Sequence, residues 1–248
     1  MNLTILRHAI IDSTNAAAME HARRGAGEGL VVIARRQTAG RGRHGRKWVS
    51  EPDAGLYFSI VLRPKVDPAT LPLITLMSGV AVHDALSEYG LRPDVKWVND
   101  VLINDRKISG ILAETTETPD GLAVIVGIGI NIKRTAVPVD LSETATSIEG
   151  ETGKAPTADD VCEVLTRYLT YFYGILTSDD GAAAILHEWR TRSSYYSGRS
   201  VRVATPEGLV IGITDGLEPN GALRVKSASG DVAIIQAGTV ERLRASEQ

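Results

Sequence analysis

Residues 96–132 read KWVNDVLINDRKISGILAETTETPDGLAVIVGIGINI and carry the clearest strand pattern in the sequence. Runs of β-branched and other apolar residues alternate there with turn residues at Asn99-Asp100, Asp105-Arg106 and 119–121. Turn residues at such short intervals are typical of antiparallel strands joined by hairpins. The stretch therefore predicts an antiparallel meander. Its last run, Leu122–Ile132, is apolar almost throughout, as expected for a central strand that is buried on both faces.

The segments before the meander predict two strands and two helices. Residues 30–37 and 55–62 are runs rich in β-branched or aromatic residues and are interpreted as strands. Residues 15–24 predict a short helix, which Ser13 or Thr14 can cap and Gly25 ends. Pro68 opens a longer helix that we expect to continue to about Tyr89.

Behind the meander, the polar residues 133–155 predict a loop, and two helices are expected to follow it. Thr157 and Asp160 resemble a capping box at the start of the first helix. The second helix is predicted over residues 182–192. The helix that follows Thr157 places apolar side chains on one face, namely Val161, Leu165, Tyr168, Phe172 and Ile175.

The last fifty residues differ in character from the rest of the chain. Short β runs are separated there by glycine-containing turns at 206–208, 215–216, 220–221 and 229–230. This spacing is typical of a small all-β barrel or roll. The predicted fold class is therefore α+β, with a mixed, mainly antiparallel sheet flanked by helices over residues 1–196. A small C-terminal β-barrel domain is predicted over residues 197–248.

The composition is that of an ordinary globular protein, with 248 residues, 43% of them hydrophobic and 23% charged. The net charge of -3 lacks the overall basic excess of a dedicated nucleic-acid binder. The single cysteine, Cys162, excludes an intramolecular disulfide and a cysteine-rich metal site. No signal-peptide pattern and no apolar run of the ~18 residues that suggest a membrane span are present, so we expect a cytoplasmic protein.

Residues 35–48, RRQTAGRGRHGRKW, carry dense positive charge with no acid among them. Gly40, Gly42 and Gly45 let backbone N–H groups approach an anion, and the arginines add bidentate donors. The segment is not a P-loop, because it lacks the Gly-Lys-Ser/Thr ending and leads into Trp48 and a strand. Since the charge is local, we favour a small anionic ligand over a polyanion. A solvated surface loop without a special role is the alternative.

Two turns in the meander end at charged residues that suit a ligand site. Lys107 lies where a turn re-enters an apolar strand, shortly before Gly110, whose small size lets a ligand approach. Asp100 lies at another turn mouth, where a carboxylate could hold a metal ion or a ring N–H group. Exposed turn chemistry without a function is the alternative interpretation.

Glycines inside the last strand of the meander predict a close approach. Gly127 and Gly129 alternate with apolar residues and therefore share one face with Asn131. A flat ring could lie there, although a tightly packed crossing of two sheets would need the same glycines. In the segment Asp12–Asn15, DSTN, helix capping alone would explain the sequence.

Together these segments resemble the catalytic core of the biotin protein ligases. The matching pieces, in order, are DSTN (12–15), RQTAGRGRHGRKW (36–48), GLYFSIVLRP (55–64), KWVNDVLINDRKISGILAE (96–114) and VGIGINI (126–132). The resemblance implies the class II synthetase-like fold of that family, with residues 1–196 as its catalytic domain. It also implies a two-step enzyme: biotin and MgATP give biotinyl-5′-AMP and pyrophosphate, and the adenylate then acylates a lysine of a biotin carboxyl carrier protein.

The resemblance assigns roles to individual residues. Arg43 and Lys107 are expected to contact the biotin carboxylate and the adenylate phosphate, and Arg46 is expected to face the departing phosphates. Asp100 is expected to activate the incoming lysine or to support Mg²⁺, whose ligands are otherwise unassigned. Biotin is expected to contact Ser13, Thr14, Asn15, Gln37, Gly40, Arg41, Arg43, Trp48, Lys107 and Gly110, and ATP to contact Arg43, Arg46, Trp48, Lys107 and Asn131.

Two departures from the family pattern are visible. Val98 stands where the family often has proline, and the match begins within the first dozen residues, so we expect an enzyme without the DNA-binding domain of some members. Residues 40–47 are expected to be disordered or open without ligand and to fold over biotinyl-5′-AMP. A lipoate-type ligase on a related fold and an RNA-binding module are the alternative functions, and a sheet-edge homodimer is left open.

Overall fold

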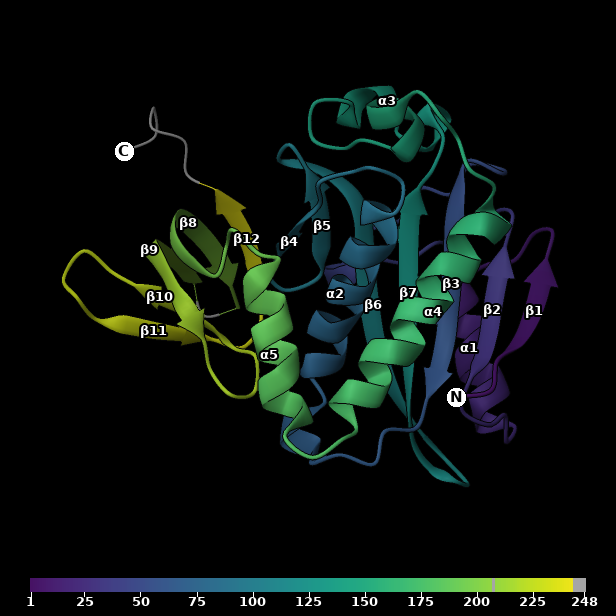
Figure 1. Ribbon diagram of the computed structural model, residues 1–248, viewed down its shortest axis with the longest axis horizontal. Helices are drawn as coiled ribbons and strands as arrows, with labels where there is room; N and C mark the ends of the chain where they lie inside the picture. Colours follow the sequence, from purple (N-terminus) through teal and green to yellow (C-terminus); the bar gives the residue numbers. More distant parts are fainter. Residues whose placement is uncertain (207, 243–248) are drawn as a thin grey trace.

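The computed structural model describes residues 1–206 and 208–242, which form two β-sheets and five α-helices (Figure 1). The larger sheet has seven strands in the order β1-β2-β3-β7-β6-β5-β4. Strands β1 and β2 pair in parallel and the other neighbours are antiparallel, so the predicted mixed, mainly antiparallel sheet is confirmed. The strands are β1 (Thr4–His8), β2 (Leu30–Ala34), β3 (Gly55–Leu62), β4 (Asp94–Lys96), β5 (Asp100–Ile103), β6 (Arg106–Thr118) and β7 (Gly121–Asn131).

The meander predicted from residues 96–132 is confirmed as β4, β5, β6 and β7. Between β5 and β6 the chain turns at Asn104 and Asp105, one residue earlier than the predicted turn at Asp105-Arg106, and Arg106 already belongs to β6. The φ angles of Asn104 and Asp105, 51° and 61°, are ones that Asn and Asp tolerate. Gly121, with a φ of 92°, begins β7 after the next turn. Strand β7 is the middle strand of the seven, as its apolar sequence predicted.

Alternate side chains of β7 lie on opposite faces of the large sheet and belong to different hydrophobic clusters. Val124, Val126 and Ile128 belong to the main hydrophobic core, to which α2, α4 and α5 contribute. Ala123 and Ile125 face the other way and pack with α1 in a smaller cluster. Figure 1 shows α2 and α4 crossing one side of the sheet and α1 on the other. The helices are α1 (Thr14–Arg23), α2 (Leu73–Ser87), α4 (Ala158–Leu176) and α5 (Gly181–Thr191).

The caps predicted for two helices are confirmed. The Ser13 side chain accepts a hydrogen bond from the Ala16 backbone N–H at the start of α1. Thr157 and Asp160 form the complete capping box of α4. Tyr168 and Ile175, predicted on the apolar face of this helix, are half-buried at the margin of the core. Within the described residues, no helix has the length and apolar character needed to cross a lipid bilayer.

Two predicted segments differ from the structure. Pro68 opens a separate 3₁₀ turn, Pro68–Thr70, and α2 begins only at Leu73, because the chain restarts the helix after Pro72. The predicted loop over residues 133–155 contains two 3₁₀ turns and a short helix, α3 (Ile148–Thr152). Ser147 caps α3, and Gly153 ends it with a φ of 74°, so a start and a stop signal were present in the sequence.

The second sheet has five antiparallel strands in the order β11-β10-β9-β8-β12 and corresponds to the predicted C-terminal β region. Residue 207 of the predicted 206–208 turn and residues 243–248 of the predicted domain lie outside the described residues. The two sheets touch: the Trp97 indole N–H donates to the Gly221 carbonyl over 2.9 Å. The strands are β8 (Ser197–Thr205), β9 (Gly208–Leu217), β10 (Leu223–Lys226), β11 (Val232–Ile235) and β12 (Thr239–Arg242).

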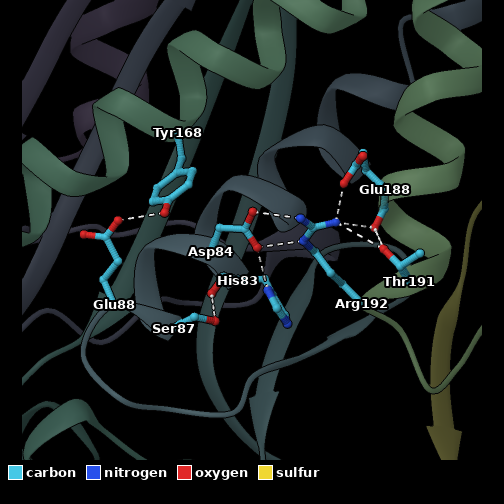
Figure 2. A network of polar contacts seen from close by, with 8 residues as sticks. All are labelled: His83, Asp84, Ser87, Glu88, Tyr168, Glu188, Thr191 and Arg192. Carbon is cyan, nitrogen blue, oxygen red and sulfur yellow. Dashed lines mark hydrogen bonds and ion pairs between the residues drawn. The ribbon is translucent and has the colours of Figure 1, made fainter.

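Polar contacts join the end of α2 to the middle of α4, through Glu88 and Tyr168, and to the end of α5, through Asp84 and Arg192 (Figure 2). Arg192 Nε and Nη2 donate to the Asp84 carboxylate over 2.7 and 2.9 Å, and Nη1 donates to Glu188. The Asp84 and Arg192 side chains are only 17% and 19% exposed, so water screens this pair weakly. Burial would raise the pKa of Asp84, but hydrogen bonds from His83 and Arg192 outweigh burial and lower it.

An Asp84→Asn variant is therefore expected to lose about 3 kcal/mol of unfolding free energy at neutral pH, because it leaves a weakly exposed guanidinium without one of its anions. Since the folded pKa of Asp84 is lowered, its contribution is present above the ordinary aspartate pKa. That contribution is lost as the pH falls through the folded pKa. Urea unfolding of both proteins from neutral to acid pH should show the gap closing, and a gap that is independent of pH would contradict this assignment.

Candidate active site

The floor of the candidate site is the α1 face of the large sheet, where β6 and β7 carry glycines. Gly127 is in register with Ser59 of β3 and with Leu112 of β6. Two residues further along β7, Gly129 is in register with Tyr57 and Gly110. The predicted placement of Gly127 and Gly129 on one face is therefore correct, and each glycine removes a side chain from the floor.

Asn15, in the first turn of α1, lies over Gly127. A Cβ atom at Gly127 would come within 2.1 Å of Asn15 Oδ1. The Asn15 amide nitrogen donates to Glu114 Oε2 over 2.8 Å and to the Leu112 carbonyl over 3.2 Å. Asn15 is buried, so its amide bridges α1 to β6 through the space that the glycine leaves.

A Gly127→Ala variant should expel Asn15 from this position, because the added methyl group and the amide oxygen cannot share the space. We expect the free energy of unfolding to fall by about 1–3 kcal/mol, as in other overpacked interiors. Chemical denaturation measures the change. Gly174→Ala is the matched control, because nothing lies within 4 Å of its added Cβ in α4. A Gly127→Ala protein as stable as this control would contradict the close packing.

Trp48 covers the next part of the floor. A Cβ atom at Gly129 would lie 2.3 Å from Trp48 Cε2, and one at Gly110 would lie 3.0 Å from Trp48 Cζ3. The ammonium of Lys107 lies 5.5 Å from the centre of a Trp48 ring, within range of a cation–π interaction. The Trp48 indole N–H is buried and has no hydrogen-bond partner among the described residues.

The basic loop folds back on itself between Gly40 and Trp48. The Gly42 N–H donates to the Arg46 carbonyl over 2.7 Å, and the Trp48 N–H donates to the Gly40 carbonyl over 3.0 Å. A Cβ at Gly40 would come within 2.4 Å of the Trp48 carbonyl oxygen, so this glycine allows the two ends of the loop to cross closely. His44 is exposed at the tip, with a φ of 55°.

The three arginines of the loop have different surroundings. Arg41 Nη2 donates to Glu114 Oε2 over 2.8 Å. Arg43 is half-buried; Nη1 donates to Asn99 Oδ1 over 3.3 Å and to the carbonyl of Gly238, just before β12, over 3.4 Å. Burial lowers the pKa of Arg43, although Asp100 opposes the shift. The Arg46 side chain is exposed and donates to the Arg43 carbonyl over 3.4 Å.

Lys107 and Asp100 form an ion pair beside the loop. Lys107 Nζ lies 2.6 Å from Asp100 Oδ1, with side chains 32% and 23% exposed. Lys96 of β4 is in register with Asp100 of β5. Burial lowers the pKa of the Lys96 ammonium group. The charge of Asp100 opposes this shift, so Asp100 interacts with Lys96 as well as with Lys107. Among the described residues, no group of three His, Cys, Asp or Glu side chains could hold a metal ion.

A buried polar cluster lies at the other end of the site, at the start of α1. Gln37 Oε1 accepts the Thr14 backbone N–H over 2.8 Å, and Gln37 Nε2 donates to Ser50 Oγ over 3.1 Å. The Thr14 hydroxyl lies 3.1 Å from Gln37 Oε1 and 2.8 Å from Ser59 Oγ. Ser59 was not predicted as a site residue, because it reads as one small residue within an apolar strand.

A cavity of about 120 Å³ brings most of the predicted site residues together. Gly40 lies outside its lining and serves the loop crossing, and Asp100 reaches it only through Lys107. Asn131 also lies outside the lining; its side-chain amide donates to the Thr146 carbonyl over 3.0 Å. The lining includes the predicted residues Ser13, Thr14, Asn15, Gln37, Arg41, Arg43, Arg46, Trp48, Lys107 and Gly110, and also Asn99, which was not predicted.

Comparisons with known proteins agree with this geometry. The model of the biotin/lipoate A/B protein ligase family matches residues 8–131. The bifunctional ligase/repressor BirA of Bacillus subtilis is 33% identical over 235 residues, which are 93% of this chain and 71% of that protein. The biotin–[acetyl-CoA-carboxylase] ligase of Paracoccus denitrificans is 33% identical over 88% of this chain and 92% of its own length.

A solved structure extends the likeness to the whole described fold. The biotin protein ligase from Aquifex aeolicus, in complex with biotin and ATP, superposes with a TM-score of 0.83 at 29% identity. The superposition covers 97% of this chain and 99% of that one. Sequence motifs, sheet order and relatives lead to the same assignment, and the chain belongs to the biotin/lipoate A/B protein ligase family.

Proposed function

We propose that the chain is an ATP-dependent biotin protein ligase, which makes biotinyl-5′-AMP and transfers biotin to a lysine of a biotin carboxyl carrier protein. One observation carries the proposal: a neutral polar cluster and a cationic cluster open onto the same glycine-floored cavity. The neutral cluster, with Thr14 and Gln37, suits an uncharged ureido ring. The cationic cluster, with Lys107 and Arg43, suits a carboxylate that meets a phosphate.

In the first step, a biotin carboxylate oxygen attacks the α-phosphorus of ATP, and the bond to the bridging oxygen of pyrophosphate breaks. Two anions approach each other, so the site has to supply positive charge and N–H donors where negative charge grows. In this proposal Lys107 and Arg43 contact the reacting carboxylate and α-phosphate, and Arg46 faces the departing pyrophosphate. Trp48 lies against the nucleotide, and Asn131 reads the adenine from the end of β7.

In the second step, the amine of the acceptor lysine attacks the carbonyl carbon of the adenylate, and AMP leaves with the electron pair of the broken bond. The amine has to lose its proton before or during the attack. Asp100 forms an ion pair with Lys107, and Lys107 lines the cavity. We assign Asp100 to orienting and activating the acceptor lysine.

Magnesium enters this proposal as part of MgATP. Mg²⁺ is commonly held by one or two carboxylates together with substrate phosphates, and Asp100 offers one carboxylate close to the proposed phosphate position. When bound, the ion neutralises phosphate charge. The residues of this chain then orient the two reacting groups and exclude water from the adenylate.

The loop from Gly40 to Lys47 is proposed to move during this cycle. A cavity of about 120 Å³ is smaller than the ~300–1,000 Å³ of most small-molecule sites. The buried Trp48 indole N–H has no hydrogen-bond partner among residues 1–206 and 208–242, and a bound ligand or a movement of the loop can supply one. Protection of backbone amides in this loop from hydrogen exchange should therefore increase when biotinyl-5′-AMP is bound.

The proposal is tested by incubating the protein with MgATP, biotin and an apo carrier domain. Labelling of the carrier lysine, with pyrophosphate release, supports the proposal, and labelling with lipoate in place of biotin favours the lipoate-type alternative. The proposed setting is the cytoplasm, and a homodimer through an exposed sheet edge stays a prediction for light scattering to test.

A further inference from the structure

Ser59 is a buried serine that contacts the neutral polar cluster without lining the cavity. Its side chain is 0% exposed, and it lies in the middle of β3, opposite Gly127. Ser59 Oγ is 2.6 Å from Asn15 Oδ1 and 2.8 Å from Thr14 Oγ1. Both partners belong to the predicted ring-binding segment, so Ser59 connects two residues of the site from beneath.

The acceptors of the Asn15 amide fix which group donates in each of these hydrogen bonds. The Leu112 carbonyl and the Glu114 carboxylate only accept, so the side of the Asn15 amide that faces them is its NH₂ group. The other side, Oδ1, therefore faces Ser59. Because Asn15 Oδ1 has no hydrogen, the single hydroxyl hydrogen of Ser59 has to lie on the bond to Asn15.

Thr14 is the donor in its hydrogen bond with Ser59. With the Ser59 hydrogen committed to Asn15, the hydrogen between Ser59 Oγ and Thr14 Oγ1 has to come from Thr14. The competing acceptor, Gln37 Oε1, is farther away at 3.1 Å and already accepts the Thr14 backbone N–H. Thr14 thus donates to Ser59, Ser59 donates to Asn15, and Asn15 donates to Glu114. A series of hydrogen bonds that all run in one direction strengthens each of them.

We propose that Ser59 is a positioning residue that makes the Thr14 hydroxyl an obligate hydrogen-bond acceptor toward the cavity. The one hydrogen of Thr14 is held inside the protein, so Thr14 Oγ1 offers only lone pairs to a ligand. The site then selects a ring that presents an N–H group at this point and rejects a ring oxygen or a sulfur there. This inference rests on the proposed function, and it names the ureido N–H as the group that separates biotin from a dithiolane ring.

The test compares biotin with its two cyclic carbamate analogues, in each of which one ureido N–H is replaced by oxygen. One analogue places its ring oxygen opposite Thr14 Oγ1. In the wild type it should bind about a hundredfold more weakly than biotin, because lone pairs of the ring oxygen and of Thr14 Oγ1 would face each other. In Ser59→Ala, the Thr14 hydroxyl keeps only the longer contact with Gln37 Oε1, at 3.1 Å, and can turn its hydrogen toward the ligand instead. The preference for biotin over that analogue should then fall to about tenfold or less. Calorimetry with the full chain measures each dissociation constant.

A merely structural role of Ser59 would weaken biotin and both analogues by the same factor and leave the ratio unchanged, and that result would overturn the inference. Ser78→Ala is the matched control, since Ser78 is equally buried, donates to the Ile74 carbonyl and lies in α2 on the opposite face of the sheet. It should keep the wild-type ratio. If Ser59→Ala does not fold, Ser59→Cys keeps the shape with a weaker donor and should give an intermediate ratio. A wild type that binds no biotin would instead refute the proposed function.

Discussion

A Lys107→Met enzyme is expected to form biotinyl-5′-AMP roughly a thousandfold more slowly than the wild type. Lys107 lines the cavity and pairs with Asp100 over 2.6 Å, so its ammonium is fixed in place before any ligand arrives. A preorganised charge of this kind stabilises the transition state without reorganisation during the reaction. Methionine keeps much of the chain length and its contact with Trp48 but removes the positive charge.

The rate is best followed by pyrophosphate release in a single turnover with biotin and MgATP, without carrier. This readout isolates the first step, so the effect cannot arise from altered binding of the carrier. Lys65→Met, at an exposed position after β3, is the control and should leave the rate unchanged. Equal rates for Lys107→Met and the wild type would remove Lys107 from the proposed reaction.

An Arg43→Ala enzyme is expected to lose about a hundredfold in the same step. Arg43 is held from two sides, by Asn99 of the meander and by the Gly238 carbonyl before β12. Removing the guanidinium takes away a bidentate donor for the phosphate. It also cuts the contact between the basic loop and the second sheet.

His44→Asn is the matched control for this second prediction. His44 is adjacent, exposed and has a φ of 55°, which asparagine tolerates better than alanine. Pyrophosphate release by the control should equal that of the wild type. Carrier labelling that survives Arg43→Ala at the full rate would refute the proposed role of the loop.

The large sheet could be predicted from sequence because its decisive signals are local. Asp105 belongs to the predicted turn and adopts, together with Asn104, the positive φ angles that a tight hairpin requires, and the apolar run of β7 marks the centre of the sheet. The helix α3 shows the limit of this approach, since a five-residue helix carries too little periodicity to stand out from a polar loop.

The site was predicted only in part, for a physical reason. Thr14, Gln37 and Lys107 belong to short motifs whose chemistry can be read directly. Ser59 and Glu114 acquire their roles from contacts over long sequence separations, when α1 settles over β3 and β6. Asn131 was placed on the correct face of β7, but its amide donates to Thr146, and the sequence gives no sign of that partner.

Glu114 connects the two halves of the site through one atom. Its Oε2 accepts from Asn15 Nδ2 and from Arg41 Nη2, each over 2.8 Å. A ligand group that draws Arg41 away leaves that oxygen to Asn15 alone, so binding at Arg41 and binding of the ring beside Asn15 are expected to be thermodynamically linked. Such linkage is reciprocal: whatever factor the group at Arg41 applies to the binding of the ring, the ring applies to the binding of that group.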